Sequence, residues 1–323
     1  MKPKVFVTRA MPAAGLDRLR EACDVDLWEG EMPPPYETLL ERVRGVDGIL
    51  CMLTDRMDAG VMDAAGAQLK VISQMAVGYD NIDVPAAAER GIAVGNTPGV
   101  LTEATADLTL ALLLAAARRI VEGVNYIHEG KWRTWEPMGL LGADLTGATL
   151  GIIGLGRIGA AVARRAAGFD MDIIAYGPRL TREEAAEAGV KKVTLETLLA
   201  TSDFVSLHCP LTEQTRGLIN AETLAQMKDS AILINTARGP IVDQQALYEA
   251  LKNGVIAAAA LDVTDPEPIP MDDPLLTLPN ALIVPHIGSA SVRTRDRMAQ
   301  MAANNLLAGL EGRPLPNAVE VSG

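Results

Sequence analysis

Short apolar runs alternate with helix-like amphipathic stretches along most of this 323-residue chain. In the first 97 residues the apolar runs predict strands at 5–8, 25–28, 48–53, 70–73 and 92–94. The stretches between them predict helices at 14–22, 36–43, 59–65 and 85–90. Strands that alternate with helices at this spacing indicate a parallel, doubly wound α/β sheet.

The same alternation resumes at residue 148, after a different kind of sequence. Six apolar runs predict strands at 149–153, 172–176, 204–209, 231–235, 256–263 and 282–284. Helical patterns follow at 182–188, 195–201, 221–227, 244–252 and 291–310. The last helix begins after the second sheet is complete, and packing on the first domain is its simplest route. We therefore expect a discontinuous first domain of 1–98 plus 288–323, and a second domain of 99–287.

Residues 101–121 are almost entirely Ala and Leu, with Arg118 and Arg119 near the end. A helix that is apolar nearly all round is normally buried. The pattern therefore predicts one long helix, either in the core or packed against another subunit. The segment 130–147, which contains Trp132 and Trp135, predicts an irregular loop.

A glycine motif lies between the first two strands of the second domain. Gly154, Gly156 and Gly159 have G-x-G-x-x-G spacing, after strand 149–153 and before a helical pattern. In this context the first glycine permits a tight turn, the second lets the backbone approach a pyrophosphate, and the third lets helix and strand pack closely. Phosphates then bind the free N–H groups of the helix N-terminus. The alternative is a glycine turn in some other α/β unit.

The residues after the second strand of this domain bear on cofactor choice. NAD-preferring sites usually place an acid about 20 residues beyond the glycines, but Gly177 occupies that position here. Pro178 and Arg179 follow, and Arg182 is close by. A missing carboxylate and a nearby guanidinium favour a 2′-phosphate, so we predict that NADP(H) is preferred. In the alternative, Arg179 is a solvated turn residue and NAD(H) is used as well.

Composition excludes several other function classes. The formal net charge of −12 argues against nucleic acid or an acidic membrane surface as a partner. No apolar run reaches the length of a membrane span, and the N-terminus has no signal-peptide layout. Cys23, Cys51 and Cys209 lack metal-ligand spacing, so we expect no metal site and reduced core thiols in a cytoplasmic protein.

Three successive strands of the second domain are followed by chemically complementary residues. Arg238 follows strand 231–235, Glu267 follows 256–263, and His286 follows 282–284. Ligands of open parallel sheets bind at the carboxyl ends of strands. An arginine can hold the carboxylate of a 2-oxo acid bidentately, an imidazolium can protonate its carbonyl oxygen, and a carboxylate can stabilise that imidazolium.

Each of these residues also has an ordinary structural interpretation when taken alone. Arg238 could be a solvated turn residue, Glu267 a loop acid and His286 a structural histidine. His208 lies in the apolar run VSLHCPL and is interpreted as structural or adjacent to the cofactor, while His128 lies in a polar region without an acid. The convergence of three complementary residues favours catalysis.

Several motifs in fixed order give the chain a family resemblance. GLGRIG, HCPLT, NTARG, LDVTDPEP and PHIGSA, together with AVGYDNID at 76–83 and the apolar segment at 95–119, resemble the D-isomer-specific 2-hydroxyacid dehydrogenase family. The resemblance covers nearly the whole chain. It implies two Rossmann-like domains with the active site in a cleft between them, and a dimer formed through the 101–121 region.

The resemblance also implies roles for individual residues. Arg238 would bind the substrate, His286 would be the acid/base, and Glu267 would support His286. Substrate would also contact backbone around Leu53, Val77 and Gly78. The expected cofactor contacts are Thr105, Gly154, Leu155, Gly156, Arg157, Ile158, Gly159, Gly177, Pro178, Arg179, Cys209, Pro210, Thr215, Thr236, Ala237, Asp262 and Gly288.

Within the family, the chain is most similar to the glyoxylate/hydroxypyruvate reductase branch, with YGPR and WRTWEP among the shared features. The sequence thus predicts reduction of a small 2-oxo acid by hydride transfer. A related reductase acting on another 2-oxo acid, such as 2-ketogluconate, is the first alternative. A dinucleotide-sensing protein without enzymatic activity is the second, and the presence of Arg238, Glu267 and His286 disfavours it.

Overall fold

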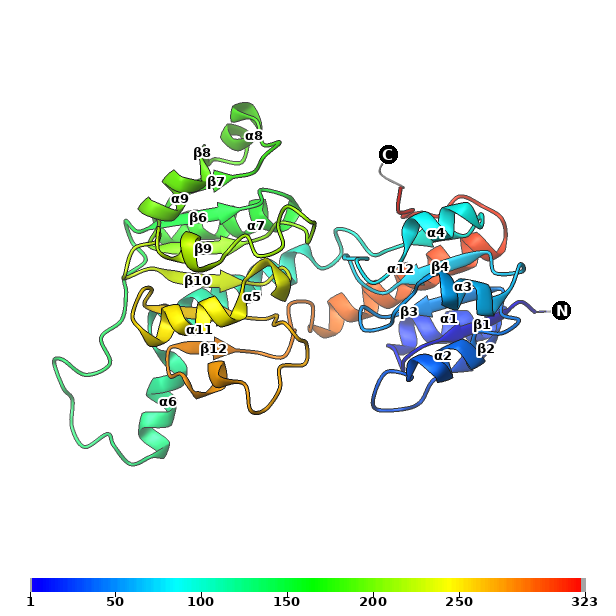
Figure 1. The fold of residues 1–323 in the computed structure, drawn as a ribbon, viewed down its shortest axis with the longest axis horizontal. Coiled ribbons are helices and arrows are strands. Elements are labelled where there is room, and N and C mark those ends of the chain that lie inside the picture. The colour runs from blue at the N-terminus through cyan, green and yellow to red at the C-terminus, as the bar shows by residue number, and fades with distance from the viewer. Residues whose placement is uncertain (1, 321–323) are drawn as a thin grey trace. The chain divides into compact units, whose positions relative to one another are not determined.

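The computed structural model describes residues 2–320 and divides into two compact units (Figure 1). The first unit is Met1–Leu101 together with Ala290–Gly323, and the second is Thr102–Ser289. Each unit contains one sheet in which all strand pairs are parallel. The predicted fold class of two parallel α/β sheets is confirmed.

The first unit is a five-stranded sheet with helices on both faces. Its strands are β1 (Lys4–Val7), β2 (Asp24–Leu27), β3 (Gly48–Cys51), β4 (Val71–Gln74) and β5 (Ala93–Gly95). Its helices are α1 (Ala13–Ala22), α2 (Tyr36–Arg42), α3 (Ala59–Ala65), α4 (Val84–Glu89) and α12 (Val292–Leu310). The strand order β2-β1-β3-β4-β5 is the flavodoxin-like order of doubly wound sheets.

Alternation along the strands distributes the core over both faces of this sheet. Ile49 packs with side chains of α2, α3 and α4, whereas Leu50 packs with those of α1 and α12. Small residues let α12 approach closely, because a Cβ at Gly309 would lie 2.6 Å from the Cβ of Val71. Ser73 adds a hydrogen bond of 2.8 Å from its Oγ to the carbonyl oxygen of Ala302. The C-terminal helix is therefore part of the first unit.

The second unit is a seven-stranded sheet. Its strands are β6 (Thr149–Ile153), β7 (Asp172–Tyr176), β8 (Lys191–Lys192), β9 (Phe204–Leu207), β10 (Ile232–Asn235), β11 (Ala258–Leu261) and β12 (Ala281–Ile283). Its helices are α5 (Thr102–Ala117), α6 (Ile120–His128), α7 (Arg157–Ala166), α8 (Arg182–Glu187), α9 (Leu195–Thr201), α10 (Ala221–Leu224) and α11 (Gln244–Lys252). Three 3₁₀ helices complete it: η1 (Ala167–Phe169), η2 (Gly239–Ile241) and η3 (Pro274–Thr277).

The strand order β12-β11-β10-β9-β6-β7-β8 is that of a Rossmann sheet with an added strand. The chain reverses direction across the sheet between β6 and β9, which is where such sheets bind ligands. Ile232 and Ile234 of β10 pack in the apolar cluster that contains α5 and α7. Leu233, between them, packs in the opposite cluster with α9 and α11.

The prediction of one long helix over 101–121 is wrong. Helix α5 ends at Ala117 and α6 begins at Ile120, with Arg119 between them in the left-handed conformation at φ 51°. The side chains of Arg118 and Arg119 can reach solvent whether the helix continues or ends there. Composition alone therefore did not indicate the break. The α5 helix is largely buried, but no residue of α6 is.

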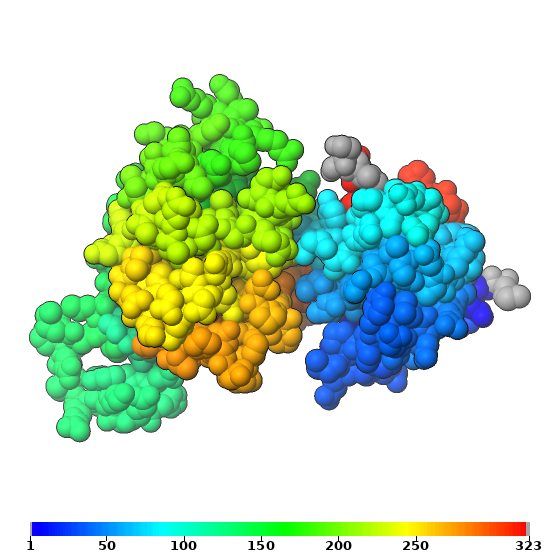
Figure 2. All heavy atoms as spheres, viewed as in Figure 1, coloured from blue at the N-terminus to red at the C-terminus, as the bar shows by residue number. Residues whose placement is uncertain are grey.

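The α6 helix and the loop after it project from the body of the second unit (Figures 1 and 2). The side chains of Ile120, Val124, Ile127 and Trp135 are between 48% and 79% exposed. The expected irregular loop over 130–147 is confirmed, since no helix or strand falls within it. Burial of the apolar residues in this region is therefore not achieved within the described chain.

The expected count of six strands is also wrong, because β8 is a seventh. It consists of two exposed lysines that pair with Ile174 and Ala175 of β7 at the edge of the sheet. Exposed lysines at an edge carry no apolar signal and are a common way to protect sheet edges. Strand β9 is shorter than the predicted 204–209, because the chain turns at His208 toward the glycine motif.

Candidate active site and cofactor site

The glycine motif forms a turn between β6 and α7 that fits the phosphates of a dinucleotide. Gly154 has φ +97°, and a Cβ there would lie 2.6 Å from the backbone nitrogen of Cys209. A Cβ at Gly159 would lie 2.3 Å from the carbonyl oxygen of Gly154. At Gly156 a Cβ would meet no atom within 4 Å, so the space over the helix N-terminus is open.

The N-terminus of α7 provides the electrostatics of this site. Gly156 is its N-cap residue and supplies no side-chain cap, and no acidic residue lies in the first turn. Arg157 is exposed in that turn, while Leu155 and Ile158 are half-buried. Free N–H groups and the positive end of the helix dipole favour a phosphate here.

A second loop packs beside the glycine turn. His208 and Cys209 follow β9 and abut Gly154. The loop then folds on itself, since the hydroxyl of Thr215 donates to the carbonyl oxygen of Pro210 at 2.7 Å. Pro210, Cys209 and Thr215 therefore lie in one short turned segment next to the glycine motif.

His208 and Cys209 are both neutral at ordinary pH. Burial lowers the pKa of His208 to about 3, and its Nε2 lies 2.8 Å from the hydroxyl of Ser206. Burial raises the pKa of the Cys209 thiol to about 11. Cys23 and Cys51 are buried as expected, but Cys209 is only half-buried against the core cluster of α9 and α11, so the prediction of a core thiol holds only in part at this position. Its place after the end of β9, in a loop, is the reason.

Gly177 and Arg179 follow β7 at the carboxyl edge. Gly177 is half-buried, and Pro178 and Arg179 are exposed. Within residues 2–320, Arg179 makes no hydrogen bond or ion pair. Its guanidinium is thus available to a ligand at the end of this strand.

A buried asparagine shapes the loop that carries Arg238. The Oδ1 atom of Asn235 accepts a hydrogen bond from the N–H of Ala237 at 3.0 Å. Its Nδ2 donates to the carbonyl oxygen of Arg238 at 2.9 Å. These two bonds fold residues 235–238, including the half-buried Arg238, into a tight turn. Arg238 Nη1 also donates to the carbonyl oxygen of Ala237 at 2.8 Å.

The loop after β10 lies directly against the loop after β11. A Cβ at Gly239 would lie 1.9 Å from the carbonyl oxygen of Thr264, so only glycine permits this approach. Glu267 is three residues beyond Thr264, and the peptide bonds before Pro266 and Pro268 are both cis. Close packing of backbones thereby brings the Arg238 loop and the Glu267 loop together.

Asp262, at the end of β11, holds the loop that carries His286. Its Oδ1 accepts from the N–H of Ile287 at 2.6 Å, and its Oδ2 accepts from the N–H of Gly288 at 2.8 Å. Its carbonyl oxygen accepts from the N–H of His286 at 2.9 Å. Burial raises the pKa of Asp262, although these two N–H groups and the nearby His286 oppose that rise.

His286 and Glu267 form a pair. Nδ1 of His286 lies 2.5 Å from Oε1 of Glu267, with side chains 26% and 34% exposed. His286 has φ 51°, a left-handed conformation that few residues other than glycine adopt. The pair orients the ring through Nδ1, and Nε2 is the ring nitrogen that Glu267 does not contact. A histidine held by a carboxylate through Nδ1 is suited to proton transfer at Nε2.

Two threonines connect α5 to the same edge of the sheet. The hydroxyl of Thr105 donates to the carbonyl oxygen of Gly288 at 3.2 Å. The hydroxyls of Thr109 and Thr236 lie 2.9 Å apart, and both residues are buried. Sequence reasoning selected Thr105, Thr236 and Gly288 but missed Thr109, which is an ordinary threonine in a helical run.

The predicted substrate contacts Leu53, Val77 and Gly78 lie in the first unit, after β3 and β4. Asn96 donates to the carbonyl oxygen of Val77 at 2.8 Å, and Gln74 donates to that of Gly78 at 3.1 Å. In the described part of the chain, the backbone N–H groups of Leu53, Val77 and Gly78 donate no hydrogen bond. With the carbonyls fixed and the N–H groups free, these loops are suited to an anion.

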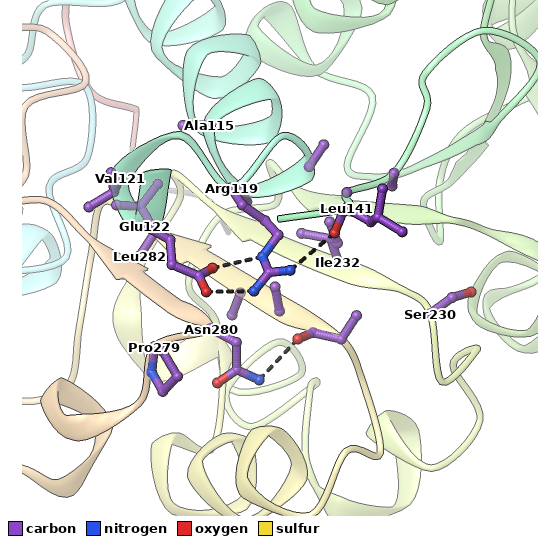
Figure 3. A pocket seen from close by; sticks show the side chains of 17 residues that line it. Ala115, Arg119, Val121, Glu122, Leu141, Ser230, Ile232, Pro279, Asn280 and Leu282 are labelled. Carbon is purple, nitrogen blue, oxygen red and sulfur yellow. Dashed lines mark hydrogen bonds and ion pairs between the residues drawn. The ribbon is translucent and has the colours of Figure 1, made fainter. Parts of the chain in front are cut away.

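A cavity of about 430 Å³ lies at the opposite edge of the second sheet (Figure 3). It lies at the amino ends of β10, β11 and β12, and none of the predicted site residues lines it. Arg119 crosses it, with Nη2 2.5 Å from Oε1 of Glu122 and Nη1 donating to the carbonyl oxygen of Leu141 at 3.2 Å. The cavity is therefore separate from the candidate active site.

A family model and similarities over the whole chain indicate the same protein family. The model for the D-isomer specific 2-hydroxyacid dehydrogenase, NAD binding domain, matches residues 110–288. The chain belongs to the D-isomer-specific 2-hydroxyacid dehydrogenase family. The chain is accordingly an NAD(P)-dependent enzyme of this family, and the glycine turn is its candidate dinucleotide site.

Curated relatives extend over the whole chain. It is 56% identical over 320 residues to the glyoxylate reductase of Korarchaeum cryptofilum, covering 99% of this chain and 96% of that protein. It is 49% identical over 321 residues to the human glyoxylate reductase/hydroxypyruvate reductase, covering 98% of each. The predicted resemblance to the glyoxylate/hydroxypyruvate reductase branch is confirmed.

Solved structures are similar to this chain over nearly its whole length. A Thermus thermophilus protein superposes with a TM-score of 0.91 at 53% identity, covering 98% of this chain and 100% of that one. The NADPH-dependent glyoxylate/hydroxypyruvate reductase of Sinorhizobium meliloti, in complex with NADP and malonate, superposes with a TM-score of 0.88 at 34% identity, covering 99% and 97%.

Residues 2–320 contain no helix long and apolar enough to cross a membrane. They also contain no group of three or more His, Cys, Asp or Glu side chains that could hold a metal ion.

Proposed function

We propose that this enzyme reduces small 2-oxo acids, with glyoxylate and hydroxypyruvate as its substrates and glycolate and D-glycerate as products. The observation that carries the proposal is the His286–Glu267 pair, held at 2.5 Å on the same sheet edge as the loop of Arg238. An acid/base pair on the same sheet edge as an arginine loop serves no purpose in a protein that only senses a dinucleotide.

The chemistry assigns one role to each side chain. When bound, the reduced nicotinamide supplies the hydride that adds to the carbonyl carbon. The guanidinium of Arg238 binds the substrate carboxylate and polarises the carbonyl. His286 donates its Nε2 proton to the carbonyl oxygen, and Glu267 stabilises the imidazolium before that transfer. One 2-oxo acid, one hydride and one proton thus give one D-2-hydroxy acid.

The predicted substrate contacts in the first unit are backbone N–H groups. Those of Leu53, Val77 and Gly78 are the candidates, since they have no hydrogen-bond partner in the described residues. The amides of Gln74 and Asn96 support this role by fixing the carbonyl groups of the same loop. Preorganised N–H groups of this kind bind carboxylates without a further charge.

We propose NADPH as the preferred cofactor, with NADH as a poorer one. The support is Gly177 in place of an acid and the exposed guanidinium of Arg179 two residues later. The Sinorhizobium meliloti reductase, which is 34% identical, is described as NADPH-dependent and was solved with NADP. The remaining predicted cofactor contacts, including Thr215, Thr236 and Ala237, stay predictions.

A panel of 2-oxo acids assayed with NADPH and with NADH tests substrate and cofactor together. Glyoxylate and hydroxypyruvate should give the highest kcat/KM, above 2-ketogluconate and pyruvate. A higher kcat/KM for 2-ketogluconate would replace the proposed substrates with that larger acid. Tight cofactor binding without turnover of any acid would instead support the dinucleotide-sensing alternative.

We further propose that the enzyme is a homodimer. Eight of the seventeen exposed large apolar side chains among residues 2–320 lie between 120 and 141. Apolar surface of this density is characteristic of protein interfaces. A second copy is the natural partner because a two-fold axis would cover the same segment on both chains. The interface proposed here is thus α6 and its loop, with α5 behind them.

Light scattering of the double variant Val124→Glu, Ile127→Glu tests the dimer. It should be monomeric at concentrations where the unmodified chain has twice the mass of one chain. Phe169→Glu, an exposed apolar residue outside the segment, should leave the mass unchanged. A monomeric unmodified chain would overturn the proposal.

The free state of Cys23, Cys51 and Cys209 supports a cytoplasmic location, which we also propose.

A further inference from the structure

The loop that carries Glu267 has few hydrogen bonds of its own. It runs from 264 to 273 and contains Pro266, Pro268 and Pro270, which lack a backbone N–H. Within the described residues, the loop has two internal hydrogen bonds. The hydroxyl of Thr264 donates to the carbonyl oxygen of Pro266 at 2.9 Å, and the N–H of Asp273 donates to the carbonyl oxygen of Pro270 at 3.0 Å. Something outside the loop must therefore fix its two ends.

The side chain of Gln244 contacts both ends. Its Oε1 accepts a hydrogen bond from the N–H of Asp265 at 3.0 Å. Its Nε2 donates to Oδ2 of Asp273 at 2.8 Å. One amide thus spans the loop at its base, with Glu267 between the two points of attachment.

Local helix structure does not account for this glutamine. Gln244 is the first residue of α11, but the cap of that helix is Asp243, whose carboxylate accepts from the N–H of Ala246 at 3.0 Å. The next residue, Gln245, is exposed and makes no hydrogen bond through its side chain in the described chain. Of two adjacent glutamines, only the half-buried Gln244 contacts the Glu267 loop.

We propose that Gln244 is a positioning residue that holds Glu267 against His286 by fixing both ends of the 264–273 loop. The inference rests on the proposed function, because it assigns Gln244 an effect only through the His286–Glu267 pair. A loose loop would let the Glu267 carboxylate leave Nδ1, and the imidazole would then lose its orientation and the stabilisation of its protonated form. Gln244 touches neither substrate nor cofactor in this scheme.

Kinetics of Gln244→Ala, with Gln245→Ala as the matched control, provide the first test. Reduction of glyoxylate with NADPH should show kcat lowered by about 10- to 100-fold in Gln244→Ala, since small displacements of a catalytic group have effects of this size. The KM for NADPH should remain within about twofold, because the glycine turn is untouched. Gln245→Ala should behave as the unmodified enzyme.

A double-mutant cycle distinguishes action through Glu267 from general damage. Glu267→Gln alone should lower kcat, and adding Gln244→Ala to it should lower kcat little further. A full additive loss would overturn the positioning role while leaving the proposed function intact. If Glu267→Gln has no effect on kcat, the assignment of the catalytic pair fails, and the inference about Gln244 fails with it.

A donor–acceptor exchange covers the case in which Gln244→Ala does not fold. Gln244→Glu keeps an acceptor for Asp265 but places a carboxylate against Asp273, so kcat should fall. Adding Asp273→Asn restores a donor opposite the new carboxylate and should recover most of kcat. Recovery supports the inference, because the rescued contact lies at the base of the loop and away from Glu267. Absence of recovery in a folded double variant, as judged by its thermal melt, would overturn it.

Discussion

The carbonyl oxygen of Thr264 lies against Gly239, only 1.9 Å from the position that a Cβ would have there. This contact joins the loop of Arg238 to the loop of Glu267. The positions of Arg238 and Glu267, which follow different strands, therefore both depend on this one backbone contact. The candidate active site therefore depends on a glycine, which has no reactive side chain.

Gly239→Ala should therefore impair both stability and catalysis. The backbone at Thr264 must move to admit a methyl group, and overpacking of this kind costs about 1–3 kcal/mol. Denaturant unfolding should register that loss, and kcat/KM should fall more than stability would explain. Gly168→Ala, in η1, where a Cβ would meet nothing within 4 Å and the backbone is not left-handed, serves as the control for glycine replacement. An unchanged kcat/KM in Gly239→Ala would contradict the proposed coupling.

Gly156→Ala and Gly159→Ala should separate cofactor binding from folding. A Cβ at Gly156 enters open space over the α7 N-terminus, so thermal stability without cofactor should hardly change. The methyl group would occupy space needed by the pyrophosphate, and the Kd for NADPH should rise by about tenfold or more, or about 1.4 kcal/mol. At Gly159 the same change would collide with the carbonyl oxygen of Gly154 and lower the melting temperature. Titration of cofactor fluorescence and thermal melts measure the two effects.

His286→Gln and Arg238→Ala should fail in different ways. Loss of the proton donor should lower kcat by about 10²–10⁴-fold while cofactor affinity stays nearly unchanged. Loss of the guanidinium should raise KM for glyoxylate and lower kcat/KM by about 100-fold or more, as expected when a charged hydrogen-bonded partner is removed. Steady-state kinetics at several substrate concentrations resolve the two patterns. Near-normal kcat/KM in both variants would show that the site is wrongly assigned.

Arg179→Ala should lower kcat/KM with NADPH by about tenfold and leave that with NADH nearly constant, because a charged hydrogen bond contributes about 1.5–3 kcal/mol. Gly177→Asp should shift preference further toward NADH, since a carboxylate repels a 2′-phosphate. The exposed Arg182 provides a nearby control. A clear NADH preference in the unmodified enzyme would contradict the proposed cofactor selection.

His208 should make the folded state sensitive to acid. Its pKa is about 3 in the folded chain, against a reference value of 6.5. Between pH 3 and pH 6.5 the unfolded chain therefore binds a proton at His208 that the folded chain does not bind. The stability is complete above about pH 6.5 and declines as pH falls toward 3. Between about pH 8 and about pH 5.5 the loss from this group should be about 1.4 kcal/mol. Urea unfolding at both pH values should show that His208→Gln loses less stability than the unmodified chain.

Much of the second sheet could be predicted because its signals are local. The positions of β6 and β7, the glycine turn between them and α11 were all placed by a few neighbouring residues whose apolar period or backbone freedom permits one local structure. Arg238, Glu267 and His286 could be selected for a related reason. Each follows a strand, and the parallel topology implied by the alternation of elements brings those strand ends to one edge.

Tertiary structure decided what holds those residues in place. Asp262 binds two N–H groups about 25 positions away, and Gln244 reaches Asp265 and Asp273 across 21 and 29 positions. Asn235 folds the Arg238 turn, and Gly239 admits the carbonyl oxygen of Thr264. Such contacts leave no periodic trace, because hydrogen bonds and backbone approaches between distant segments form only when the sheet has assembled. The sequence by itself determined which groups could react and at which edge they meet, whereas their orientation and the break between α5 and α6 depended on contacts that only the folded chain makes.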